Sequence, residues 1–127
     1  MTAAMCLAVA VYFEARGEPL PGQYAVAEVV MNRVKDKRYP NTVCGVVFEK
    51  KAFSFTHDGK PDKLPNAHTR ASKRALEVAK TILSGPVLGI TSTHYHTVKV
   101  KPYWRKYFDL DGKVGGHIFY TNNTKYK

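Results

Sequence analysis

The first third of the chain carries apolar residues in two helical patterns. Residues 3–16 combine good helix formers with an almost all-round apolar surface, which predicts a buried helix that ends at Gly17. Glu14 therefore lies in the last turn of that helix. A second helix is predicted to begin near Pro21, since proline is tolerated in a first helical turn. It should run to about Lys37, with one apolar and one solvated face.

Two further helices are predicted downstream. Asn41 or Thr42 can cap a short third helix, because both side chains accept hydrogen bonds from a first helical turn. Residues 67–83 place apolar side chains at helical spacing with Lys and Arg outward, and Gly85 with the proline after it is a stop signal. Residues 56–68 predict a functional loop, because a loop of this length is uncommon as a plain connector.

After Thr91 the pattern changes to β-branched and aromatic residues. Residues 93–98 and 116–120 each predict a strand, and together they predict a small antiparallel sheet. Residues 109–112, Asp-Leu-Asp-Gly, predict a turn in the connection between the strands. Residues 121–127 are polar and predict a frayed tail. The expected fold class is α+β, mainly helical with a small antiparallel sheet.

Length and charge limit the classes of protein. The chain has 127 residues, 44% of them apolar, which predicts a single domain over residues 1–127. The longest apolar run, residues 3–13, is shorter than the about 20 residues of a membrane span, so no stable membrane insertion is expected. The formal net charge of +10 predicts an anionic partner, such as nucleic acid, an anionic membrane surface or an acidic cell-wall polymer.

The two cysteines, Cys6 and Cys44, fall in apolar surroundings and lack the C-x-x-C or C-x-x-H spacing of a metal site. They could pair in a disulfide, but nothing in the sequence requires it. Free thiols in the core are the expectation, because unpaired cysteine is among the most buried residue types.

Among ten carboxylates, most lie in turns or beside lysines, where solvent is expected. Glu28 and Glu77 fall on polar sides of amphipathic helices and are predicted to be solvated. Glu14 differs, because it leaves a buried helix next to two aromatic residues, where burial raises the pKa of a carboxyl group. A carboxylic acid that is neutral near physiological pH can protonate a leaving oxygen. From spacing alone, a structural acid paired with Arg16 or another cation is the alternative.

Three histidines form a second candidate constellation. His94 and His96 would share one face of a strand about 6.6 Å apart, and His117 could supply a third zinc ligand. No carboxylate or cysteine accompanies the pair. The favoured interpretation is a polar cleft wall whose imidazoles bind substrate or backbone, and neither a metal nor another cofactor is expected.

Aromatic residues alternate with Lys and His in the last third of the chain, and their faces can bind sugar rings or nucleic-acid bases. The cations around Trp104 could form a binding surface for single-stranded nucleic acid. These cations are Lys99, Lys101, Arg105 and Lys106. No RRM, zinc-finger, KH or helix-turn-helix pattern supports that function, so nucleic acid is not the expected partner. The motifs G-x-S-x-G, Walker A and H-E-x-x-H are also absent.

An ordered series of motifs covers most of the chain. It begins with residues 12–18, Tyr-Phe-Glu-Ala-Arg-Gly-Glu, and residues 22–34, Gly-Gln-Tyr-Ala-Val-Ala-Glu-Val-Val-Met-Asn-Arg-Val. The series continues with Tyr39-Pro40-Asn41-Thr42, Phe53-Ser54-Phe55, Thr93-His94-Tyr95-His96, Pro102-x-Trp104 and Gly116-His117-x-Phe119-Tyr120. Over residues 5–120 it resembles the cell-wall hydrolases that include spore cortex-lytic enzymes.

The resemblance implies a domain like those of lysozymes and lytic transglycosylases, acting on the glycan strands of peptidoglycan. It implies that Glu14 is the catalytic acid, and that Glu18 supports the site, in one arrangement by pairing with Arg16. The residues expected to bind substrate or support the site are Arg16, Glu18, Phe53, Ser54, Tyr95, His96, Trp104 and His117. The sequence departs from the family in residues 50–63 and 109–113.

A single catalytic carboxylate favours a lytic transglycosylase that cleaves between N-acetylmuramic acid and N-acetylglucosamine. Glycoside hydrolases normally use two carboxylates, whereas attack by the sugar's own C6 hydroxyl needs one and leaves a 1,6-anhydromuramoyl end. Lysozyme-like hydrolysis of the same bond is the alternative.

The chain does not begin with the Lys/Arg segment of a secretory signal, which predicts mature sequence. This favours a phage endolysin released by a holin over a catalytic domain of a longer secreted protein. In either case the expected place of action is the bacterial cell wall or periplasm. The charge should draw the protein, expected to be a monomer, to anionic cell-wall or outer-membrane polymers.

Overall fold

The computed structural model describes residues 1–49, 64–66 and 68–127. Its elements are α1 (Ala3–Ala15), α2 (Leu20–Lys35), α3 (Val43–Val47), α4 (Arg70–Ser84), β1 (His94–Thr97), the 3₁₀ helix η2 (Tyr103–Lys106), β2 (Asp109–Val114) and β3 (His117–Thr121). The predicted α+β class and the predicted helices are confirmed. Thr42 caps α3 and Gly85 caps the end of α4, as expected. No helix in the described residues is long and apolar enough to cross a membrane.

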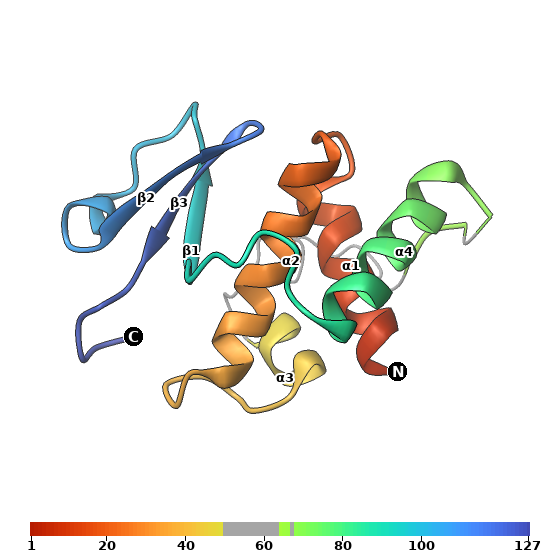
Figure 1. Cartoon of the computed structure of the whole chain (residues 1–127), viewed down its shortest axis with the longest axis horizontal. Helices are drawn as coiled ribbons and strands as arrows, with labels where there is room; N and C mark the ends of the chain where they lie inside the picture. The colour runs from red at the N-terminus through yellow and green to blue at the C-terminus, as the bar shows by residue number, and fades with distance from the viewer. Residues whose placement is uncertain (50–63, 67) are drawn as a thin grey trace.

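The helix α1 is the centre of the helical layer. It packs against α2, α3 and α4, and Figure 1 shows it between α2 and α4. Every residue from Cys6 to Val11 is at most 1% exposed, which explains why apolar residues surround α1 instead of forming one stripe. By contrast, α4 buries a single face, made of Ser72, Ala75, Val78, Ala79 and Ile82.

The sheet is antiparallel, with strand order β1-β3-β2. The predicted turn at residues 109–112 is wrong, because these residues belong to β2, which contains an irregularity between Leu110 and Gly112. The hairpin turn lies instead at Gly115 and Gly116, where Gly115 has a φ of 60°. Two central glycines suit a tight two-residue hairpin, whereas an isolated glycine in a strand often marks a bulge.

One face of the sheet packs against the helices. Phe119 of β3 is 1% exposed and lies in an apolar cluster with Ala15 of α1 and with Ala25, Val26 and Val29 of α2. Figure 1 shows the sheet beside α2, on the side away from α4. This packing brings the sheet to the end of α1 that carries Glu14.

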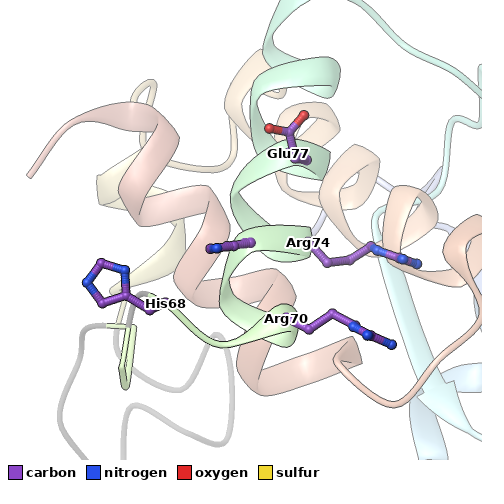
Figure 2. A pocket seen from close by; sticks show the side chains of 5 residues that line it. His68, Arg70, Arg74 and Glu77 are labelled. Carbon is purple, nitrogen blue, oxygen red and sulfur yellow. The ribbon is translucent and has the colours of Figure 1, made fainter.

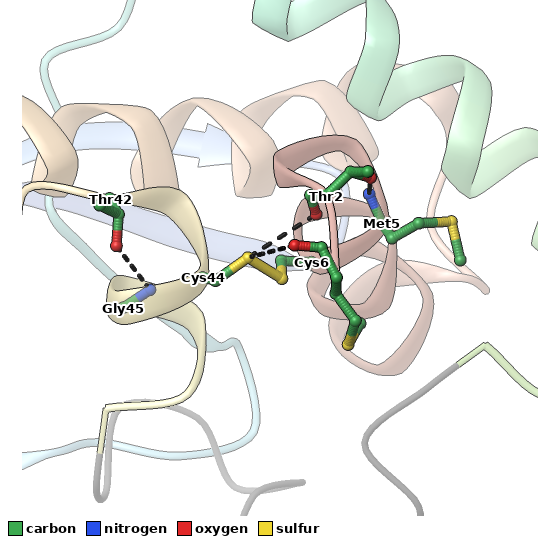
Figure 3. The surroundings of a disulfide bond; sticks show 7 residues. Thr2, Met5, Cys6, Thr42, Cys44 and Gly45 are labelled. Atoms are coloured by element: carbon green, nitrogen blue, oxygen red, sulfur yellow. Dashed lines mark hydrogen bonds between the residues drawn. A yellow bond between two sulfur atoms is a disulfide. The ribbon is translucent and has the colours of Figure 1, made fainter.

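Cys6 and Cys44 form a disulfide that joins α1 to α3, as Figure 3 shows. The expectation of free thiols is therefore wrong. The two Cα atoms are 5.2 Å apart because α3 folds back against the first turns of α1. The cysteines are 38 residues apart in sequence, so only the tertiary fold brings them together.

Removing this disulfide is expected to lower the free energy of unfolding by about 4 kcal/mol, because the bond closes a loop of 38 residues in the unfolded chain. Urea denaturation of the Cys6→Ser/Cys44→Ser variant, or of the reduced protein, measures the effect. An unchanged denaturation midpoint in both would contradict the prediction.

The C-terminal segment is held to the domain, so the predicted frayed tail is wrong. The Arg38 guanidinium donates hydrogen bonds to the backbone carbonyls of Asn122, Thr124 and Tyr126, at 2.9, 2.7 and 3.0 Å. Asp36 holds the same guanidinium from the other side, at 2.6 Å. A polar tail can therefore be ordered by hydrogen bonds alone, which its composition does not reveal.

Glu28 is buried, at 3% exposure, and the prediction of a solvated Glu28 is wrong. Its Oε2 accepts hydrogen bonds from the backbone N–H groups of Val87 and Leu88, at 3.2 and 2.8 Å. Its Oε1 accepts from those of Gly89 and Ile90, at 2.8 and 3.3 Å. One carboxylate thus fixes the segment that leads from α4 to the sheet. Glu77, in contrast, is exposed as predicted.

Candidate active site

Glu14 lies in the last turn of α1, where the helical layer meets the sheet. It is partly buried, and the Tyr95 hydroxyl of β1 donates a hydrogen bond to its Oε1. Tyr95 reaches Glu14 because β1 pairs with the central strand, opposite Phe119, on the face that packs against the helices. Two candidate residues that are 81 positions apart in sequence are therefore in direct contact.

Burial raises the pKa of Glu14 above its ordinary value, while the Tyr95 hydrogen bond and the Arg33 charge oppose the rise. A carboxyl group in this environment keeps its proton to a higher pH than a solvated glutamate. It can therefore deliver that proton to a leaving oxygen.

Arg16 does not pair with either glutamate of the motif. Its guanidinium lies over the Tyr12 ring, 5.0 Å from the ring centroid, and donates a hydrogen bond of 2.7 Å to the Tyr12 hydroxyl. The described residues contain no ion pair between Arg16 and Glu14 or Glu18. Both suggested pairings of Arg16 are therefore wrong, and Glu14 is not held as the partner of that cation.

Tyr95→Phe is expected to shift the alkaline limb of the pH–activity profile to higher pH. The Tyr95 hydrogen bond lowers the pKa of Glu14, so its removal raises that pKa further. Activity of a general acid is lost as pH rises through its pKa, hence the direction of the shift. Initial rates on purified cell walls across a pH series measure the limb. A limb that moves to lower pH would contradict this role of Tyr95.

Glu18, in the turn between α1 and α2, anchors the β2–β3 hairpin. Its Oε1 accepts a hydrogen bond of 2.5 Å from the Gly116 backbone N–H. A Cβ atom added at Gly115 would lie 2.5 Å from Oε1, and one at Gly22 would lie 3.1 Å from the Glu18 Cβ. The glycines next to Glu18 therefore leave room for its carboxylate. The structure connects the first motif of the sequence to the last through this contact.

His117 stands between Glu18 and Tyr95. Its Nδ1 is 3.7 Å from Glu18 Oε1, and its ring meets the Tyr95 ring edge-on with 5.0 Å between centroids. The residue is 5% exposed, and its buried Nδ1 has no hydrogen-bond partner among the described residues. Burial lowers the pKa of His117, although the Glu18 charge opposes the shift. Glu14, Tyr95, His117 and Glu18 thus form one continuous group.

His96 and Trp104 lie on the opposite face of the sheet from Tyr95. His96 Nε2 is within hydrogen-bond distance of the Tyr120 hydroxyl, at 2.8 Å, and Trp104 packs against both rings. Because side chains alternate along a strand, His96 does not share the inner face with Tyr95, and Trp104 of η2 lies on the His96 side because its ring contacts those of His96 and Tyr120. Of the residues expected to bind substrate or support the site, His96 and Trp104 thus lie across the sheet from Tyr95 and Glu14.

The same alternation separates the three histidines that could have bound zinc. His117 pairs with Thr97, and its ring contacts Tyr95 and Phe119 on the inner face, whereas His94 packs against Trp104 and Phe108 on the outer face. Burial and nearby arginines lower the pKa of His94 to about 4, so it is neutral at physiological pH. Within residues 1–49, 64–66 and 68–127, no three His, Cys, Asp or Glu side chains gather as metal ligands.

Phe53 and Ser54, the remaining candidates, lie outside the described residues, as does most of the predicted loop over residues 56–68.

Arg33 is a site neighbour that the sequence analysis missed. It is 7% exposed in α2, and its Nε donates a hydrogen bond of 2.8 Å to the Thr93 carbonyl just before β1. Its charge acts on both Glu14 and Tyr95. The sequence did contain a signal for Arg33, because it is a cation among the apolar residues of the second motif. Counting charges over the whole chain does not separate such a buried arginine from solvated ones.

The family described as Cell Wall Hydrolase matches residues 17–120, which include Glu18, Tyr95 and His117. The chain belongs to the cell wall hydrolase family. The matched span begins just after Glu14.

Curated relatives of this chain are spore cortex-lytic enzymes. The Bacillus cereus enzyme is 53% identical over 113 residues, which are 89% of this chain and 42% of that protein. The Bacillus subtilis enzyme is 50% identical over 64 residues, which are 50% of this chain and 21% of that protein. The chain therefore spans less than half the length of these relatives.

Two solved structures share the fold. The catalytic domain of the germination-specific lytic transglycosylase SleB from Bacillus anthracis superposes with a TM-score of 0.80 at 34% identity, covering 94% of this chain and 93% of that one. The catalytic domain of the Bacillus cereus SleB protein has a TM-score of 0.72 at 36% identity, covering 94% and 89%. The expected mainly helical architecture is therefore that of known catalytic domains.

Proposed function

We propose that this domain cleaves the glycan strands of peptidoglycan between N-acetylmuramic acid and N-acetylglucosamine, as a lytic transglycosylase with Glu14 as its acid. The observation that carries the proposal is the partly buried Glu14 carboxyl at the junction of α1 and the sheet, with its raised pKa. The match to a SleB catalytic domain described as a lytic transglycosylase supports the reaction class.

The proposed reaction uses the Glu14 carboxyl twice. In the first step it donates its proton to the glycosidic oxygen, and the bond from that oxygen to C1 of the muramoyl residue breaks. In the second step the Glu14 carboxylate accepts the proton of the C6 hydroxyl of the same residue, whose oxygen bonds to C1. Glu14 regains its proton and no water is consumed. The nucleophile is already tethered to the reacting centre, so no second carboxylate is needed to orient it.

The position of Glu18 supports a one-carboxylate reaction. A hydrolase that uses two carboxylates needs the second one free to bind water or to attack C1. Glu18 instead accepts the Gly116 N–H at 2.5 Å and lies beside buried His117. We therefore assign Glu18 and His117 to positioning the hairpin and Tyr95 next to Glu14.

The proposed place of action is the bacterial cell wall. The relatives are enzymes named for the spore cortex, and they lend no support to the expected phage endolysin. A disulfide between Cys6 and Cys44 is typical of proteins that act outside the reducing cytoplasm.

A digest in heavy-oxygen water tests the reaction. Transglycosylation is expected to leave 1,6-anhydromuramoyl ends without the label, because the new bond uses the sugar's own oxygen. Mass spectrometry of the muropeptides measures the label. It also shows whether each product is one water lighter than the product of hydrolysis. Uniform label at muramoyl reducing ends would replace the proposal with hydrolysis of the same bond and would leave Glu14 as the acid.

A further inference from the structure

The solvent-facing side of α4 carries a row of cations with a hollow beside it. A hollow of about 430 Å³ is lined by His68, Arg70, Lys73, Arg74 and Glu77, and Figure 2 shows it at close range. We call these five residues the α4 basic groove. All five are exposed, and Lys80 continues the row of cations along the same helix.

The cations of the α4 basic groove contribute neither to the buried face of α4 nor to an ion pair within the described part of the chain. The buried face of α4 consists of other residues, and none of Arg70, Lys73 and Arg74 forms an ion pair with another of the described residues. Cations in the first turns of a helix also gain nothing from the helix dipole, which favours acids there. These side chains are therefore available to an external anion.

The spacing of the cations favours a linear polyanion. Arg70 and Arg74 are four residues apart, so they are neighbours on one face, and Figure 2 shows their side chains extending to the same side of α4. The face of α4 from Arg70 to Lys80 extends for about 15 Å at the helical rise per residue, and along it four cations outnumber the one carboxylate, that of Glu77. Guanidinium groups pair with phosphate oxygens through two parallel hydrogen bonds. Phosphodiester charges recur along one unbranched backbone, whereas the stem carboxylates of peptidoglycan sit on separate side chains.

We propose that the α4 basic groove binds the phosphodiester backbone of a polyol-phosphate polymer of the cell wall and holds the domain at the wall. Membership of the cell wall hydrolase family makes a wall polymer the relevant polyanion. Figure 1 shows α4 beginning at the end of the bundle where α1 ends. A polymer bound to Arg70 and Arg74 therefore lies at the same end of the helical layer as Glu14. The proposal does not depend on which bond the site cleaves.

The test is co-sedimentation with cell-wall sacculi in a Glu14→Gln background, so that the walls stay intact. The groove variant is Arg70→Gln/Lys73→Gln/Arg74→Gln. The matched control, Lys99→Gln/Lys101→Gln/Lys106→Gln, removes the same charge from exposed positions around η2. Each variant is compared on sacculi that carry the polymer and on sacculi freed of it by hydrofluoric acid, which cleaves phosphodiesters. Thermal unfolding establishes that both variants are folded.

The groove variant is expected to bind polymer-bearing sacculi about tenfold or more weakly than the parent, with a salt-dependence slope smaller by about 2. The control should lose much less affinity, and on stripped sacculi the groove variant and parent should bind alike. If the groove variant and the control lost the same affinity, the binding would depend on net charge and not on the groove. A groove-dependent loss that persists on stripped sacculi would assign the groove to stem carboxylates. Displacement by single-stranded DNA but not by purified polymer would assign it to nucleic acid. Each of these three results overturns the proposal, and none bears on the product of Glu14 catalysis.

Discussion

Glu14→Gln is expected to lower the rate of cell-wall cleavage by about 10²- to 10⁴-fold, the usual contribution of a general acid. The amide keeps the shape of the side chain and can still accept the Tyr95 hydrogen bond, but it has no transferable proton. The release of soluble muropeptides from purified sacculi measures the effect. Circular dichroism should show an unchanged fold, since the substitution removes no apolar packing.

The matched control for this loss is Glu77→Gln, on the exposed face of α4. It should leave cleavage within a few-fold of the parent. Glu28, which sequence reasoning offers as an equivalent control, cannot serve, because its carboxylate is buried and accepts four backbone hydrogen bonds. Parent-like activity of Glu14→Gln would remove Glu14 from the reaction.

Glu28→Gln is expected to lower the free energy of unfolding by about 3 kcal/mol, because hydrogen bonds to a charged acceptor are strong and a buried donor left unpaired is costly. The Glu28 oxygens accept from the backbone N–H groups of residues 87–90. The glutamine amide has one oxygen, which can accept from two of these N–H groups, and one NH₂ group, which faces the other two. Those two backbone N–H groups then meet a donor and lose their hydrogen bonds. Urea denaturation measures the loss.

Hydrogen exchange locates this effect within the domain. The amides of Leu88 and Gly89, which donate the shorter hydrogen bonds to Glu28, should exchange faster in the Glu28→Gln variant. For Glu77→Gln the free energy of unfolding should stay within about 0.5 kcal/mol of the parent, as is usual for an exposed position. A Glu28→Gln variant as stable as the parent would show that the segment between α4 and the sheet is held by other contacts.

The sequence by itself was enough to predict the helices, the signals at their ends and the catalytic candidate. Helical spacing and end signals are local, so residues 3–16 and 67–83 predicted α1 and α4 to within three residues at either end. Glu14 was found in the same way, because a carboxylate in the last turn of an almost entirely apolar helix is expected to be partly buried. The ordered motifs then indicated the family that the comparison shows.

Which side chains meet depends on the three-dimensional fold. The disulfide, the burial of Glu28 and the tail held by Arg38 each join residues far apart in sequence, and no local pattern encodes such contacts. Strand register decided the rest of the site. A register shift of one residue exchanges the two faces of a strand. The sequence could therefore name Tyr95 and His96 as candidates, but it could not show which of them faces the helices. In the structure Tyr95 contacts Glu14, and His96 contacts Tyr120 on the other face of the sheet. That choice followed from the burial of Phe119 against α2, which turns one face of the sheet toward the helices and the other toward Trp104.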